Sequence, residues 1–169
     1  MNEILLKEPK GLILDLRNNG GGYLEIAVDI LCEFLEGEVE AVTIKRRDSS
    51  DDETLYVDGS PRLPHVPIVV LINDGSASAS EIVAGAIQDY ERGIVLGETS
   101  FGKGSVQEVD QLSDGSSIRL TIARWFTPND TNIDDVGITP DIEVAMTDQD
   151  YENDRDPQLD AAIEYLKNL

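Results

Sequence analysis

Pro67-Ile68-Val69-Val70-Leu71-Ile72 leads through Asn73 into Asp74-Gly75-Ser76-Ala77-Ser78-Ala79-Ser80-Glu81. The apolar run predicts a buried strand of the parallel type. The second stretch opens a helix expected over Ser78–Glu91, because apolar residues then recur on one helical face. The junction is a strand-to-helix turn, where free backbone N–H groups can face a developing oxyanion. This arrangement predicts an α/β fold with serines at the beginning of a helix.

The serines of this turn admit two interpretations. Ser78-Ala79-Ser80-Glu81 fits the Ser-x-x-Glu capping box, in which a serine hydroxyl and a glutamate carboxylate satisfy two free N–H groups of the helix. Three serines alternating with small residues exceed what a cap needs, and small residues let another chain approach the turn closely. A serine of this turn is therefore a candidate nucleophile as well as a candidate cap.

A glycine-flanked lysine follows one short strand later, in Phe101-Gly102-Lys103-Gly104-Ser105-Val106-Gln107. A lysine can act as the base for a serine only when it is neutral, which requires a pKa about three units below the usual 10.4. Burial away from carboxylates produces such a shift, and this segment contains no acidic residue. Gln107 lies an even number of residues beyond Lys103, so on a strand it shares that face and can orient the amine. The leading hypothesis is a hydrolase with a serine nucleophile and a lysine base. The alternative interpretation of Lys103 is an ordinary surface lysine in a glycine turn, without a catalytic role.

Three other chemistries fit the sequence less well. The only histidine, His65, is separated from the serine turn by roughly 20 Å of extended chain, which disfavours a Ser-His-Asp triad. The glycine-rich stretch Arg17–Gly22 lacks the spacing of nucleotide-binding fingerprints and better suits backbone N–H groups that approach a substrate carbonyl. The acidic stretch Asp148–Asp156 lacks the glycine and glutamate of a calcium loop, so we expect a solvated linker there. The sequence predicts neither a cofactor nor a metal site.

The composition bounds the class of protein. With 169 residues, 40% of them hydrophobic and 28% charged, the chain suits one globular domain with one core. The formal net charge of −21 disfavours nucleic acid and anionic membrane surfaces as partners. The single cysteine, Cys32, excludes an internal disulfide and is expected to be buried as a small hydrophobe. The sequence contains neither a membrane span nor a signal peptide, and its abrupt beginning is consistent with a cut from a larger precursor.

Strand and helix alternate in the first half of the chain, and strands dominate the second. The first unit is the strand Gly11–Leu16, the glycine turn Arg17–Gly22 and a helix over Leu24–Leu35. Val39–Arg46 and Thr54–Val57 are expected to pair as a hairpin. The remaining expected elements are strands over Ile94–Leu96, Ser105–Asp110 and Ser117–Thr127, and a final helix from Pro157.

In combination, these segments resemble the protease core of the carboxyl-terminal processing, or tail-specific, proteases. The similarity extends over nearly the whole chain, and the separate motifs follow the family's order. The matching stretches are Gly11–Gly22, Gly75–Tyr90, Gly97–Gln107, Gly137–Asp141 and Asp156–Leu159.

The resemblance implies a serine endopeptidase that cleaves protein substrates near their C-termini through an acyl-enzyme. By the family's pattern, the nucleophile, the general base and its orienting amide fall on Ser78, Lys103 and Gln107. The oxyanion donors implied are the backbone amide of Ala79 and one amide of the glycine turn, Gly22 or Gly21.

The resemblance also implies a spiral ββα core of the ClpP and crotonase type, formed by a single domain over residues 1–169. Family members usually carry an export signal, an N-terminal helical region and a PDZ domain. We expect this chain to be the protease core without its PDZ domain, and to hydrolyse peptides slowly or not at all in isolation. The expected substrates are polypeptides with apolar C-termini, and the implied location is the cell envelope or periplasm. The sequence leaves both a monomer and a homo-oligomer open.

Two hypotheses from other classes remain open. Retinoid-binding repeats resemble this core and bind ligands without proteolysis, although the intact set of Ser78, Lys103 and Gln107 argues against that function. An acyl-CoA enzyme of the crotonase superfamily would retain its cofactor and would leave Ser78 unlabelled by serine-reactive reagents.

Overall fold

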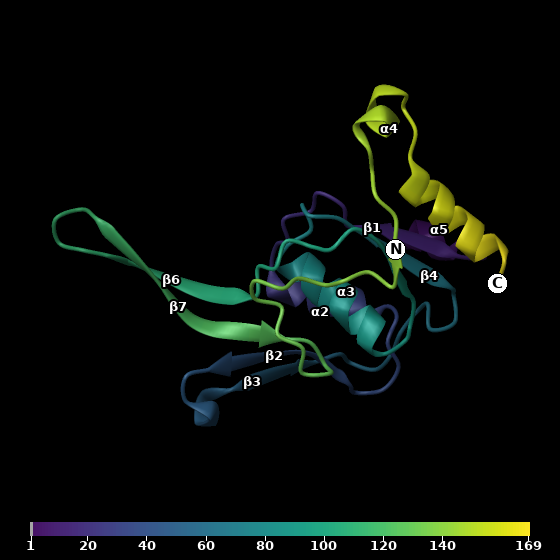
Figure 1. Ribbon diagram of the computed structural model, residues 1–169. Helices are drawn as coiled ribbons and strands as arrows, with labels where there is room; N and C mark the ends of the chain where they lie inside the picture. The colour runs from purple at the N-terminus through teal and green to yellow at the C-terminus, as the bar shows by residue number, and fades with distance from the viewer. Residues whose placement is uncertain (1) are drawn as a thin grey trace.

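Two four-stranded sheets organise residues 2–169, the part of the chain that the computed structural model describes (Figure 1). Sheet A is parallel with the order β1-β4-β5-β8, and sheet B is antiparallel with the order β3-β2-β7-β6. The strands are β1 (Leu12–Asp15), β2 (Glu40–Arg46), β3 (Glu53–Tyr56), β4 (Ile68–Ile72), β5 (Ile94–Gly97), β6 (Ser105–Gln111), β7 (Ser117–Phe126) and β8 (Ile142–Glu143). The structure confirms a mixed α/β fold.

Helices cover both faces of sheet A. The helix α5 packs on one face against β4 and β5, while α3 packs against β5 and also contacts α2 and β2 of sheet B. Figure 1 shows α2 and α3 side by side, with β2 and β3 beyond them. The helical elements are α1 (Asn2–Leu5), α2 (Leu24–Cys32), the short 3-10 turn η1 (Ser49–Asp51), α3 (Ala79–Asp89), α4 (Asp148–Glu152) and α5 (Pro157–Lys167).

The strand β4 lies between β1 and β5, and all five of its side chains are buried, as the apolar run predicts. Because side chains alternate along a strand, β4 contributes to two separate apolar clusters. One cluster contains Val69 and Leu71 with residues of α5. The other, larger cluster contains Ile68, Val70 and Ile72 with residues of α2 and α3. The strand that precedes the serine turn is therefore fixed from both faces.

Three sequence-based expectations need correction, and one element was not expected. The helix expected over Leu24–Leu35 ends at Cys32, and the chain then turns so that Leu35 remains buried outside it. Cys32 itself is only half-buried. The expected linker Asp148–Asp156 contains the helix α4, because Thr147 caps it with Oγ1, which accepts from the Asp150 amide at 3.2 Å. The two-residue strand β8 was not expected.

The hairpin β6–β7 projects from the body of the molecule (Figure 1). Along β7 only Ala123 is buried. Val109 and Leu120 are about half exposed, at 53% and 47%. Within residues 2–169, no helix is both long enough and apolar enough to cross a bilayer.

Candidate active site

Ser78 occupies the turn between β4 and α3 in a backbone conformation that residues other than glycine rarely adopt. Its φ and ψ are 60° and −120°. Such a conformation costs about 1–3 kcal/mol and persists only where the surrounding structure imposes it, most often at functional sites. The residue is 6% exposed, and its amide donates to Glu81 Oε2 at 2.7 Å, which is the glutamate half of the expected capping box.

Ser76 fixes the chain as it enters this turn. Its hydroxyl donates to the Leu16 carbonyl oxygen, just beyond β1, at 2.7 Å. The same hydroxyl accepts from the Asn73 amide at 3.0 Å. Ser76 is fully buried. One serine of the alternating series therefore has a structural role, which explains part of the excess of serines over what a cap needs.

The Asn73 carboxamide joins the serine turn to the glycine turn. Its Oδ1 accepts from the Asn18 amide at 2.8 Å and from the Gly75 amide at 3.1 Å. Its Nδ2 donates to Asn18 Oδ1 at 3.1 Å. The two turns meet because β1 and β4 are parallel neighbours, whose carboxyl ends lie at one edge of the sheet. Nothing in the sequence marks Asn73 for this role, and we did not anticipate it.

Gly21 lies against the backbone of the serine turn. A Cβ atom there would stand 2.6 Å from the Ala77 carbonyl oxygen and 2.9 Å from the Ala79 nitrogen, and its φ is +95°. The position therefore requires glycine on both grounds. The Ala77 amide also donates to the Asn19 carbonyl oxygen at 3.0 Å. The glycine turn and the serine turn are therefore in direct backbone contact.

The amides around this contact differ in their partners. The Gly21 amide donates to Asn19 Oδ1 at 3.0 Å and is thereby occupied. The amides of Gly22 and Ala79 make no hydrogen bond within residues 2–169. Free amides at a helix N-terminus and in an adjacent glycine turn are suitable donors for an oxyanion.

An apolar pocket of about 210 Å³ opens beside these amides. The glycine turn forms one wall, and α2 and α3 form the others; the apolar side chains that line it are Leu16, Tyr23, Ile26, Ala27, Ile30, Ala79 and Val83. Tyr23 and Ile26 are 80% and 52% exposed and stand at the rim. The pocket has the size and polarity to take an apolar side chain.

The backbone of the lysine loop is held from two sides. The Phe101 amide donates to the Ser76 carbonyl oxygen at 2.9 Å, which joins the loop to the serine turn. On the opposite side, the Trp125 amide donates to the Gly104 carbonyl oxygen at 2.7 Å. A Cβ atom at Gly104 would stand 2.2 Å from the Asp134 nitrogen. The glycine there permits close packing, and these contacts fix the backbone of the lysine loop.

The side chains of Lys103 and Gln107 are both exposed. In residues 2–169 neither makes a hydrogen bond or an ion pair, so the expected burial of the lysine is not found. Lys103 precedes the first residue of β6, Ser105, so the alternation of faces along that strand does not apply to Lys103 and an even separation does not establish a shared face. His65 is exposed in the loop before β4, at the end of that strand away from the serine turn.

Arg17 begins the glycine turn and ties it to the end of the chain. Its guanidinium donates to Asp156 Oδ1 at 2.8 Å, to Asp15 Oδ2 at 2.7 Å and to Gln158 Oε1 at 3.0 Å. The hydrogen bond from Arg17 lowers the pKa of the Asp156 carboxyl below its usual value. Asp156 also caps α5, because its Oδ1 accepts from the Leu159 amide at 2.9 Å.

Residues 1–144 match the peptidase family S41. The chain belongs to this family. Over 136 residues it is 47% identical to a carboxy-terminal-processing protease of Bartonella bacilliformis, covering 80% of this chain and 31% of that protein. Over 143 residues it is 39% identical to the chloroplastic carboxyl-terminal-processing peptidase 3 of Arabidopsis thaliana, covering 85% of this chain and 27% of that protein. The resemblance to the carboxyl-terminal processing proteases is therefore confirmed, and this S41 chain spans about a third of the length of those relatives.

A solved structure of the photosystem II D1 C-terminal processing protease matches the fold with a TM-score of 0.76. Its sequence is 40% identical, and the match covers 85% of this chain and 36% of that one. A solved structure from Parabacteroides merdae matches with a TM-score of 0.80 at 28% identity, and the match covers 98% of this chain and 56% of that one. The S41 assignment thus agrees in sequence and in fold.

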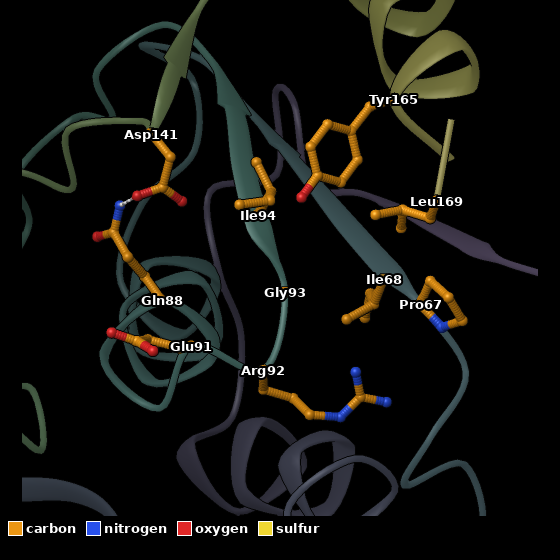
Figure 2. A pocket seen from close by; sticks show the side chains of 10 residues that line it. All are labelled: Pro67, Ile68, Gln88, Glu91, Arg92, Gly93, Ile94, Asp141, Tyr165 and Leu169. Carbon is orange, nitrogen blue, oxygen red and sulfur yellow. Dashed lines mark hydrogen bonds between the residues drawn. The ribbon is translucent and has the colours of Figure 1, made fainter. Parts of the chain in front are cut away.

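A cavity of about 360 Å³ in this S41 chain lies away from the candidate site (Figure 2). It is bordered by Ile68 and Ile94, the first residues of β4 and β5, whereas Ser78 follows the opposite end of β4. Figure 2 shows the Arg92 side chain along its edge. The Arg92 guanidinium donates to the carbonyl oxygens of Phe34, Leu63 and Val66, and burial lowers its pKa. These contacts give Arg92 a structural role.

Proposed function

We propose that this chain is the catalytic core of a serine endopeptidase that cleaves polypeptides near their C-termini through an acyl-enzyme. The proposal rests on one observation: the strained, buried Ser78 directly precedes Ala79, and Ala79 and Gly22, which line the same pocket, have backbone amides without a partner in residues 2–169. A cap alone requires neither the positive φ nor the free amide of a second turn. A nucleophile beside an oxyanion site accounts for both.

In the proposed mechanism, Ser78 Oγ attacks the scissile carbonyl carbon and its proton passes to Lys103 Nζ. The oxyanion accepts hydrogen bonds from the Ala79 and Gly22 amides, while Gly21, whose amide is occupied by Asn19, shapes the turn. Lys103 returns the proton to the leaving amine as the C–N bond breaks. Water then hydrolyses the ester by the same steps, again with Lys103 as the base.

Gln107 is proposed to orient the Lys103 amine. Because both side chains are exposed here, the arrangement needs a bound polypeptide that covers them. Such a cover removes water from around the amine and favours its neutral form. The hydrogen bond from the Phe101 amide to the Ser76 carbonyl oxygen keeps the lysine loop beside the serine turn.

The substrate class follows from the pocket beside Ser78. A mainly apolar lining suits an apolar side chain next to the scissile bond, and we propose polypeptides with apolar C-termini as substrates. The names of the relatives, which describe C-terminal processing, support this direction of cleavage. The strong negative charge argues against nucleic acid as a partner.

The wider architecture is proposed on the same grounds. We infer that residues 1–169 form one protease core with the spiral ββα arrangement of the ClpP and crotonase type, and that they do not include a PDZ domain. An extracytoplasmic location is proposed from the family, and the chloroplastic relatives are compatible with it.

Labelling with a serine-reactive fluorophosphonate, followed by peptide mapping, tests the proposal. We expect the label on Ser78 in the 169-residue chain. Ser78→Ala should abolish labelling, whereas the matched variant Ser80→Ala should retain it. Label on Ser80, or no label on any serine of the turn, would overturn the assignment. Retention of a ligand together with an unreactive Ser78 would favour a binding module or an acyl-CoA enzyme.

A further inference from the structure

The Glu81 carboxylate is fully buried and accepts four hydrogen bonds. Oε1 accepts from the Ser100 hydroxyl and from the Gly102 amide, both at 2.6 Å. Oε2 accepts from the Ser78 amide at 2.7 Å and from the Lys103 amide at 2.9 Å. A capping box accounts for the bond to Ser78 alone. The other three bonds reach the segment that carries the lysine.

No cation accompanies this buried charge: among the ion pairs of residues 2–169, none involves Glu81. Burial of an unpaired carboxylate is costly unless its oxygens are hydrogen-bonded, and helix capping is available to an exposed acid without that cost. Helix capping therefore does not explain the burial, whereas the contacts to the lysine loop do.

We propose that Glu81 is a positioning residue that fixes the nucleophile and the general base in one frame. This proposal rests on the roles given above to Ser78 and Lys103. Because both amides contact the same oxygen, their nitrogens cannot be farther apart than the two bond distances added together. The carboxylate thereby holds Ser78 at its positive φ and holds the beginning of the Lys103 side chain beside it. Glu81 itself contacts no reacting atom.

Glu81→Gln is the decisive variant, because it keeps the shape of the side chain and replaces one acceptor oxygen with an NH₂ group. Two of the four donors then face a donor and lose their partner. The Gly102 amide contacts Oε1 and the Lys103 amide contacts Oε2, so we expect hydrogen exchange of whichever amide faces the new NH₂ group to accelerate by roughly tenfold or more, while the amides of β4 change little. The rate of fluorophosphonate labelling at Ser78, measured well below the melting temperature, should fall by on the order of 100-fold.

The pH profile distinguishes positioning from a loss of stability. If Lys103 is the general base, the pH profile of labelling in the wild-type chain should differ from that of Lys103→Ala. If Glu81 positions Lys103, the profile of Glu81→Gln should resemble that of Lys103→Ala. A contribution to stability alone would leave the profile of the folded molecules unchanged. The control is Glu25→Gln, which removes one exposed charge from the first turn of α2 and should match the wild type.

The outcomes separate this proposal from the proposed function. An unlabelled wild-type Ser78 would refute the peptidase mechanism, and hydrogen exchange would then decide alone whether Glu81 holds the loop. Unchanged exchange and unchanged labelling in a folded Glu81→Gln chain would overturn the proposal. If that variant does not fold, hydrogen exchange of the wild-type chain provides the test. Protection of the Gly102 and Lys103 amides would support the proposal, and exchange as fast as in an open loop would overturn it.

Discussion

Ser78→Gly is expected to give a more stable protein than Ser78→Ala. Both variants lack the hydroxyl, so their difference isolates the Cβ atom at φ 60° and ψ −120°. Release of the backbone strain favours glycine by about 1–3 kcal/mol. The greater freedom of glycine in the unfolded chain offsets up to about 1 kcal/mol of that gain. The net difference should be about 1 kcal/mol in favour of glycine.

Urea unfolding, followed by circular dichroism, measures this difference directly. In thermal melts it corresponds to roughly 2–4 °C for a chain of this size. The matched control is the same pair of substitutions at Ser80, which lies inside α3. There alanine should be the more stable by up to about 1 kcal/mol, because Ser80 is the second residue of the helix and glycine is less favourable than alanine in a helix. If alanine is the more stable at both positions, the backbone of Ser78 is not strained and the structural argument for a nucleophile fails.

Three further outcomes are expected. Gly21→Ala should destabilise the chain by more than about 2 kcal/mol and abolish fluorophosphonate labelling of Ser78, because the new Cβ atom would clash with the Ala77 carbonyl oxygen. Urea unfolding measures the first effect and the labelling rate measures the second. Lys103→Arg should be as unreactive as Lys103→Ala, since a guanidinium keeps its proton at neutral pH, and substantial labelling would rule out a general base there. The pKa of Asp156 is lowered in the folded state by Arg17, so the stability it contributes is present above about pH 4 and lost as the pH falls through the lower folded value. Asp156→Asn should therefore cost about 1 kcal/mol or less at pH 7, and pH-dependent melts should show the difference shrinking as the pH falls below about 4.

The sequence is informative wherever local pattern and tertiary environment agree. The buried strand over Ile68–Ile72 and the helix that follows it were predictable, because a run without polar residues has one stable place in an α/β fold. Pro157 marks the first turn of α5, where its missing N–H has no cost. The β2–β3 hairpin also forms as expected.

The remaining features depend on contacts between distant segments. The strand β8 has two residues, too few for a period, and exists because it pairs with Leu96 and Gly97 of β5. Asn73 resembles any turn asparagine until Asn18 is placed beside it. Glu81 resembles an ordinary cap until the lysine loop folds over it. The positive φ of Ser78 has no trace in the sequence, because serine does not favour it.

The parallel sheet also sets the order in which this molecule can assemble. In the pairing of β1 with β4, Leu12 lies opposite Ile68. The long loop between these residues must close, at a cost in conformational entropy, before the two strands make any contact. The β6–β7 hairpin joins neighbouring strands and can form early. The hydrogen bonds between Asn18 and Asn73 require that β1 and β4 are already paired. During refolding, reactivity at Ser78 should therefore appear only as this slow, long-range pairing forms. The site is therefore expected to be among the last parts of the chain to become native, well after most of its secondary structure.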